Sequence, residues 1–240
     1  VLTLFAIARE INSAGRYTSG TIQVQLAVGL PPAHFGAQHQ AFTSYFLGRG
    51  PVSFVFRQKP YTILINDVAC FPQSYAAAVT ILPTLQNEHR ALVLDIGGFT
   101  ADYLQLRNGE GNLAVCDSLE SGVISLYNKI ISKVNAEHDM LLDEEEIDAI
   151  LLKQKSPPVP DIGRIVERQA QDFINDLFST LRERGLELKT GKVVFVGGGS
   201  ILLRRQILAS GKIGSALFVE DVRANAKGYE LLYQAVSGGR

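Results

Sequence analysis

The stretch ALVLDIGGFTAD, residues 91–102, places a run of apolar positions before an aspartate, two glycines, a threonine and a second aspartate. The apolar run predicts a buried strand that ends at Asp95. Glycines let a backbone approach a ligand closely, and successive N–H groups in a tight turn form an anion-binding nest, so the turn is suited to phosphate. A phosphate beside a carboxylate requires a divalent cation between them, so we interpret Asp95 as a ligand of Mg²⁺, directly or through water. A strand-end turn residue without a ligand is the alternative.

A second glycine-rich strand end occurs at VVFVGGGS, residues 193–200. A strand that enters glycines and then a helix is a common plan for binding nucleotide phosphate or adenosine. Close strand–helix packing uses glycines in the same way without a ligand, so the pattern alone leaves both interpretations open. It is not a dinucleotide fingerprint, because Leu202 stands where the third glycine would fall, and it is not a P-loop, because Val193 replaces serine or threonine after Gly-Lys.

A third stretch, FPQSYAAA at residues 71–78, predicts a helix start with Gln73 beside it. A glutamine side chain both donates and accepts hydrogen bonds, so facing phosphates it can orient a water for in-line attack. An exposed residue at a helix start is the alternative.

Composition excludes several classes of function. The 240 residues are 46% hydrophobic and 20% charged, with a net charge of -1, which is ordinary for a globular chain. No basic stripe is present, so we expect no direct binding to nucleic acid or to anionic membranes. Cys70 and Cys116 form no zinc-binding or disulfide pattern, and neither a spanning segment nor a secretion signal is evident, so we expect a cytoplasmic protein.

Strands alternate with helices along the chain, which predicts an α/β fold. A hairpin is expected over 51–71, with Lys59 and Pro60 in its loop. Residues 135–188 are expected to form a helical insertion, in which Asp143 and Glu146 have the spacing of a capping box. The expected helices cover 2–14, 36–47, 121–134, 143–153, 161–184 and 224–236.

Taken in order, Pro-Gln with an alanine-rich helix, DIGGFTAD, ESGVISLYNKI, VFVGGGS and ANAKGY resemble the actin, hexokinase and heat-shock chaperone ATPase superfamily. LAVGLPP, QHQAFTSYFLG and NDVACFPQSYAAA extend the similarity toward plasmid-segregation actins of the ParM/StbA type. The resemblance implies an actin-like, ribonuclease H-like fold of two lobes. Residues 1–90 would be the remainder of the N-terminal lobe and residues 91–240 the C-terminal lobe, with the final helix, 224–236, returning toward the first.

The resemblance also implies roles for individual residues. Gln73 would position the attacking water and Asp95 would act with Mg²⁺. The remaining cofactor-binding positions would hold the phosphates, sugar and adenosine of ATP or ADP: Gly97, Gly98, Thr100, Glu120, Gly122, Gly197, Gly198, Gly199 and Ser200. Arg168 and Gln171 are the positions offered for the adenine.

One departure from the family concerns its first phosphate loop, an aspartate-x-glycine turn between the first two strands, which this sequence lacks. We expect either a shortened piece of a longer protein or a form that hydrolyses ATP poorly. A sheet edge without its first strands would also be exposed to self-association.

The resemblance implies an ATPase that polymerises into filaments for plasmid partitioning, with copies of itself and a DNA-binding adaptor as partners. A chaperone-type ATPase, a small-molecule kinase and a non-hydrolysing nucleotide-dependent scaffold are the alternatives.

Overall fold

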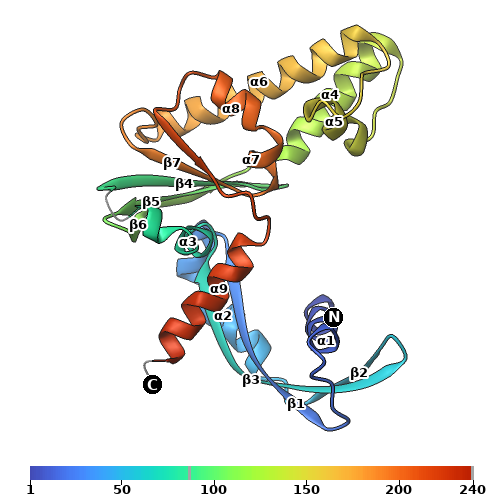
Figure 1. Ribbon diagram of the computed structural model, residues 1–240, viewed down its shortest axis with the longest axis vertical. Helices are drawn as coiled ribbons and strands as arrows, with labels where there is room; N and C mark the ends of the chain where they lie inside the picture. The colour runs from blue at the N-terminus through green and yellow to red at the C-terminus, as the bar shows by residue number, and fades with distance from the viewer. Residues whose placement is uncertain (86–87, 239–240) are drawn as a thin grey trace.

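The computed structural model describes residues 1–85 and 88–238, which form two β-sheets in two lobes (Figure 1). The lower lobe in Figure 1 contains the N-terminal part of the chain, and the upper lobe contains the larger sheet with a layer of helices on one face. This architecture confirms the expected two-lobed α/β fold. Within the described residues, none of the helices combines the length and apolar character needed to cross a bilayer.

The first lobe is built on a sheet of strand order β1-β3-β2. Strand β1 runs parallel to β3, and β2 pairs with β3 as an antiparallel hairpin. Helix α1 packs on this sheet, where Ala8 and Ile11 meet Tyr61 and Ile63 in a small apolar core. The elements are α1 (Leu2–Ser13), β1 (Thr21–Leu30), α2 (Pro32–Leu47), β2 (Val52–Phe56) and β3 (Lys59–Pro72).

The turn of the β2–β3 hairpin differs from the expected one. Arg57 and Gln58 form it, with φ angles of 48° and 65°, and β3 already begins at Lys59. Two consecutive positive φ angles are typical of the tight two-residue hairpin turn, whose twist matches that of the strands. The expected loop at Lys59 and Pro60 was therefore wrong, because the proline lies at the start of a strand, where a missing N–H is tolerated.

The second lobe is built on a five-stranded sheet of order β6-β5-β4-β7-β8. The β4–β5–β6 strands form an antiparallel meander, whereas β7 and β8 are parallel to β4. Its elements are β4 (Arg90–Ile96), β5 (Ala101–Arg107), β6 (Glu110–Leu119), α4 (Val123–His138), α5 (Glu144–Leu151), α6 (Pro160–Glu183), β7 (Lys192–Val196), α7 (Gly198–Leu202), α8 (Arg204–Ala209) and β8 (Ser215–Phe218).

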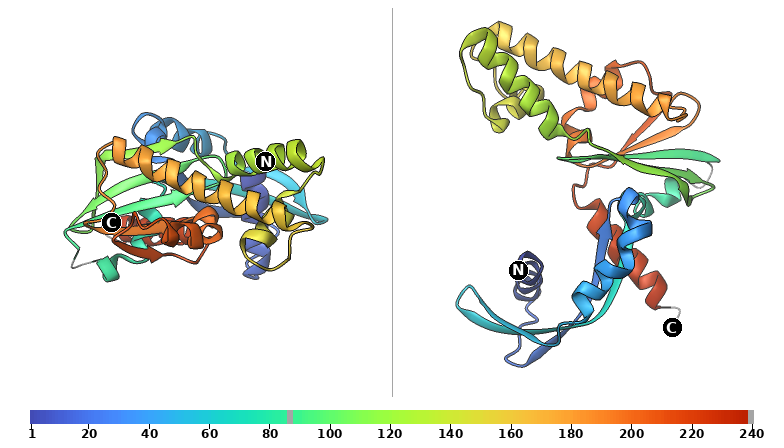
Figure 2. Two further views of the ribbon diagram at one scale, coloured as in Figure 1. Left: turned by 90° about the horizontal axis from the view of Figure 1, so that it is seen from above. Right: turned by 180° about the vertical axis from the view of Figure 1, so that it is seen from behind.

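Helices α4 and α6 lie together over one face of the large sheet (Figure 2). The expected capping box is present at α5, where Asp143 accepts from the N–H of Glu146 and the Glu146 side chain accepts from the N–H of Asp143. Along α6, apolar residues recur at helical spacing and face the sheet, so this helix is part of the core of the lobe.

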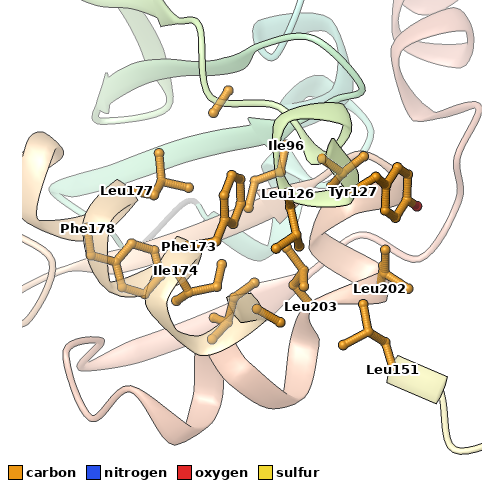
Figure 3. Packing of buried hydrophobic residues seen from close by; sticks show 14 of the residues in the cluster. Ile96, Leu126, Tyr127, Leu151, Phe173, Ile174, Leu177, Phe178, Leu202 and Leu203 are labelled. Atoms are coloured by element: carbon orange, nitrogen blue, oxygen red, sulfur yellow. The ribbon is translucent and has the colours of Figure 1, made fainter. Parts of the chain in front are cut away.

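The core between these helices and the sheet is filled by large apolar side chains (Figure 3). Leu126 of α4 and Ile96 of β4 are fully buried, and Phe178 lies 6.3 Å, centroid to centroid, from Phe195 of β7. Complete burial of one such side chain contributes about 1.5–3 kcal/mol. The helical layer thus holds the strand ends of the sheet in place.

The opposite face of the large sheet packs on α3 (Tyr75–Val79), the short helix η1 (Leu82–Leu85) and α9 (Ala224–Ser237). Helix α9 then continues beside β1 and β3 of the first lobe (Figure 1). A Cβ on Gly228 of α9 would lie 1.7 Å from the carbonyl oxygen of Ala76 in α3, so the two helices cross in direct backbone contact. This crossing joins the two lobes.

Candidate functional site

The two glycine-rich stretches of the sequence lie side by side in the second lobe. Strands β4 and β7 are parallel neighbours, with Asp95 opposite Val196, so the carboxyl ends of both strands meet at one edge of the sheet. A Cβ on Gly197 would lie 2.4 Å from Oδ1 of Asp95, and Gly197 has a φ of 85°. Only glycine therefore lets the second loop approach the aspartate this closely.

The loop from Gly97 to Thr100 is anchored through its carbonyl groups. The oxygens of Gly97, Gly98 and Phe99 accept hydrogen bonds from the first N–H groups of α4 and its cap residue, and the Gly97 N–H donates to the Thr100 oxygen. The N–H groups of Gly98, Phe99 and Thr100 have no acceptor within the described parts of the chain. Three neighbouring unpaired donors are the chemistry of an anion nest.

Asp95 lies at the base of this loop with only 9% of its surface exposed. Its Oδ2 atom accepts a hydrogen bond of 2.8 Å from Nδ2 of Asn225 on α9. Burial raises the pKa of Asp95, the hydrogen bond from Asn225 opposes that shift, and the neighbouring Asp102 carboxylate adds to it. The site thus holds a carboxylate that gains from a nearby cation.

A second carboxylate, Asp102, faces Asp95 across the β4–β5 ladder. It is 4% exposed, and its Oδ1 atom has no hydrogen-bond partner within the described residues. Burial raises the pKa of Asp102, an effect partly opposed by the nearby side chains of Ser118 and Thr100. No role was expected for Asp102 from the sequence, although the register of the β4–β5 hairpin, which places residues 95 and 102 opposite each other, marks the pair.

Gln73 lies where the chain leaves β3, beside a strained turn. Ser74 has φ 63° and ψ −50°, and the N–H of Tyr75 donates to the Gln73 oxygen at 2.6 Å, which closes a three-residue γ-turn. The N–H of Ser74 donates to Oδ1 of Asn225 at 3.0 Å, and the Gln73 side chain hydrogen-bonds the Tyr229 hydroxyl. Gln73 is therefore tied to the same helix, α9, that contacts Asp95.

The members of the second glycine loop differ in exposure. Gly198 is exposed, and a Cβ added to it would meet open space, whereas Gly199 is buried against Ile96. Ser200 is fully buried, and its hydroxyl donates to the Gly197 oxygen at 2.8 Å. The hydroxyl of Ser200 is thus used to close its own turn.

The remaining predicted positions lie around these loops. Gly122 lies under the first loop, since a Cβ there would be 2.1 Å from the Gly98 oxygen, and Glu120 is exposed beside it. Arg168 is exposed and paired with Asp172 on its own helix, whereas the Gln171 amide donates to the backbone oxygen of Gln206. Gln171 therefore contributes to the packing of α6 on α8.

These residues fit the nucleotide and metal that the resemblance implies. The unpaired N–H groups suit phosphate oxygens, and the unpartnered Oδ1 of Asp102 lies in the same buried carboxylate pair as Asp95. No group of three or more acidic, histidine or cysteine ligands occurs in residues 1–85 and 88–238. Mg²⁺ commonly retains several waters and uses one or two carboxylates together with substrate phosphates, which matches this donor set.

Comparisons with known proteins agree with the fold. Residues 93–208 match the family model described as archaeal actin homologue MreB-like, C-terminal. None of the curated proteins matches the chain. The solved structure of the archaeal actin homologue Ta0583 superposes with a TM-score of 0.72 at 19% identity, over 97% of this chain and 75% of that one.

Two further solved structures give the same result. The complex of Ta0583 with ADP has a TM-score of 0.68 at 18% identity, over 95% of this chain and 77% of that chain. A 15-stranded ParM filament from Clostridium botulinum has a TM-score of 0.69 at 17% identity, over 95% of this chain and 73% of that chain. The chain therefore has an actin-like fold of two lobes, and its residues 93–208 match the family model of MreB-like C-terminal archaeal actin homologues.

Proposed function

We propose that this protein binds ATP or ADP with Mg²⁺ at the paired glycine loops, hydrolyses ATP and assembles with copies of itself into filaments. The observation that carries the proposal is the meeting of both loops over the buried Asp95–Asp102 pair. A neighbour of the same fold was solved with ADP and another as a filament, which supports nucleotide binding and self-association here. The proposal extends to plasmid partitioning in the cytoplasm, through a DNA-binding adaptor. It also divides the chain into lobes at about residue 90.

The proposed roles follow from the chemistry of each group. The loop at Gly97, Gly98 and Thr100 binds phosphate oxygens through the free N–H groups of Gly98, Phe99 and Thr100. Asp95 binds Mg²⁺, which when present supplies positive charge against the phosphates. Gln73 orients the attacking water through its amide. The positions around the sugar and adenosine are Glu120, Gly122, Gly197, Gly198, Gly199 and Ser200.

Nucleotide binding is tested by titrating the chain with a fluorescent ADP analogue in the presence of Mg²⁺. We expect Asp95→Ala to weaken binding or turnover by about 10–100-fold, as is usual when a metal-associated group is removed. Asp176→Ala, an exposed aspartate on α6, is the matched control and should bind as the unchanged protein does. If Asp95→Ala has the same affinity and turnover as the unchanged protein, the loop after β4 is not a site for Mg²⁺ and phosphate.

Filament formation is tested by light scattering after addition of ATP, ADP or no nucleotide. ATP held between two lobes favours a closed state, so scattering should rise with ATP and decay as ATP is hydrolysed. Pelleting and electron microscopy distinguish filaments from aggregates. Scattering that is independent of nucleotide at every protein concentration would contradict the filament part of the proposal.

A non-hydrolysing nucleotide-dependent scaffold is the second candidate. It is favoured by the hydrogen bond between the Gln73 side chain and Tyr229, which occupies part of the amide that would otherwise orient water. ATP binding without phosphate release would support it. The chaperone-type ATPase and the small-molecule kinase share the fold, and a kinase would transfer phosphate to a sugar or carboxylic acid in a substrate screen. Fold alone does not distinguish these activities.

A further inference from the structure

One side chain on α9 contacts both halves of the candidate site. Asn225 donates from Nδ2 to Oδ2 of Asp95 at 2.8 Å and accepts at Oδ1 from the Ser74 N–H at 3.0 Å. Both the nitrogen and the oxygen of the Asn225 side-chain amide are therefore hydrogen-bonded. Asp95 lies 130 residues from Asn225 in the sequence and Ser74 lies 151 residues from it, so this one residue links the end of β4 to the exit of β3.

The turn that Asn225 holds has an uncommon backbone conformation. Ser74 combines φ 63° with ψ −50° and is completely buried. A non-glycine residue in such a conformation is strained and persists only where its surroundings impose it. Without the Asn225 oxygen the buried Ser74 N–H would lose its acceptor, which adds a further penalty. The conformation of the turn thus depends on Asn225.

Gln73 immediately precedes this turn, so the direction of its side chain depends on the same contact. Tyr229, one helical turn after Asn225, hydrogen-bonds the Gln73 side chain. The ring of Tyr229 stacks on Phe71 at 6.5 Å, and a Cβ on Gly29 would lie 2.0 Å from its hydroxyl oxygen. One face of α9 therefore holds Asp95, Ser74 and Gln73 together.

We propose that Asn225 is a positioning residue that aligns the Asp95 carboxylate with the Ser74 turn and, through that turn, with Gln73. Because its two partners lie on different elements, the end of β4 and the turn between β3 and α3, a relative movement of these elements strains one of its two hydrogen bonds. Asn225 thereby links the position of the β3–α3 turn relative to β4 to the alignment needed for hydrolysis. The link to hydrolysis rests on the proposed function, whereas the positioning of Ser74 is a property of the chain without nucleotide.

The positioning is tested first on the nucleotide-free chain, by amide hydrogen exchange at Ser74 measured by NMR. Asn225→Ala removes the acceptor and should speed exchange of this amide about 10-fold, the equivalent of one hydrogen bond. Asn225→Asp keeps an oxygen toward Ser74 and should retain most of the protection. Gln234→Ala is the control, because the side chain of this exposed α9 residue hydrogen-bonds Glu230 of its own helix and, within the described residues, makes no hydrogen bond to the Ser74 turn. Unchanged Ser74 protection in Asn225→Ala would overturn the proposal.

The link to hydrolysis is tested by comparing the affinity for the fluorescent ADP analogue with the rate of phosphate release from ATP. Both Asn225 variants lose the donor to Asp95, so phosphate release should fall about 10–100-fold with little change in affinity. Where Asn225→Asp retains the protection of the Ser74 amide, its loss of rate separates the environment of Asp95 from general destabilisation, although its new carboxylate also repels Asp95. Equal loss of affinity and rate would contradict a positioning role. If the unchanged chain neither binds nor hydrolyses nucleotide, the proposed function fails, and Ser74 exchange alone decides the role of Asn225.

Discussion

At the scale of single residues, the site is defined by two carboxylates that face each other on adjacent strands. Asp95 and Asp102 are both nearly fully buried, and burial raises the pKa of each. A carboxylate that is ionised in such a place destabilises the folded chain, because the charge was better solvated in the unfolded state. The arrangement is therefore costly for stability and suited to holding a positive charge.

This cost predicts that Asp102→Asn stabilises the nucleotide-free chain near neutral pH. A raised pKa means that the folded state binds the proton more readily, so the cost is present when the pH exceeds the raised pKa and vanishes below the ordinary carboxyl pKa. We expect a gain of about 1 kcal/mol at about pH 7, which shrinks as the pH falls toward about 4. Urea unfolding in EDTA measures it, with the exposed Asp176→Asn as control. A loss of stability in Asp102→Asn at both pH values would mean that the carboxylate is already satisfied.

At the scale of elements, the crossing of α3 and α9 sets the positions of Gln73 and Asn225. The contact is made by backbone, since Gly228 touches the carbonyl oxygen of Ala76 and leaves no room for a side chain. Ala76, Ala77 and Ala78 are completely buried beside it. Small residues on both helices thus allow the close approach that brings the side chains of α9 to both loops.

Gly228→Ala should therefore destabilise the chain by about 1–3 kcal/mol, the usual cost of overpacking a dense contact. Gly36→Ala is the matched comparison, because Gly36 lies in α2 and a Cβ added to it would have no atom within 4 Å. There the higher helix propensity of alanine should stabilise the chain by up to about 1 kcal/mol. Chemical denaturation of both variants measures the difference, and similar changes in the two would show that the α3–α9 contact can relax.

At the scale of the whole molecule, the small sheet of the first lobe has β1 at one edge, within the described residues. A groove of about 550 Å³ runs along this edge and is lined by β1 and α1 residues, among them Ile22, Val24 and Gln25. Unpaired strand edges pair readily with other chains unless a charge or a cover prevents it. Self-association along β1 is thus expected to compete with the proposed filament formation.

Gln25→Lys places a charge on the exposed edge and should lower light scattering in the absence of nucleotide, while ATP-dependent scattering persists. Gln154→Lys adds the same charge at an exposed position of the second lobe and serves as the control. Circular dichroism confirms that both variants are folded. Equal suppression by the two substitutions would attribute the effect to net charge and would exclude a role for the β1 edge.

The sequence by itself determined the order of strands and helices, the two glycine loops and the capping box of α5, and the order of its motifs gave the resemblance that implied the actin-like architecture. These features depend on local periodicity and on turn residues, which neighbouring positions decide. The expected hairpin loop at Lys59 and Pro60 failed because turn type depends on the pairing register of β2 with β3.

Only the tertiary structure decided which side chains meet. Asn225 contacts Asp95 and Ser74 across 130 and 151 residues of chain, and no local pattern marks a contact of that separation. The glycines of ALVLDIGGFTAD therefore indicate a close approach of backbone, whereas packing of α9 beneath the sheet decides what Asp95 faces.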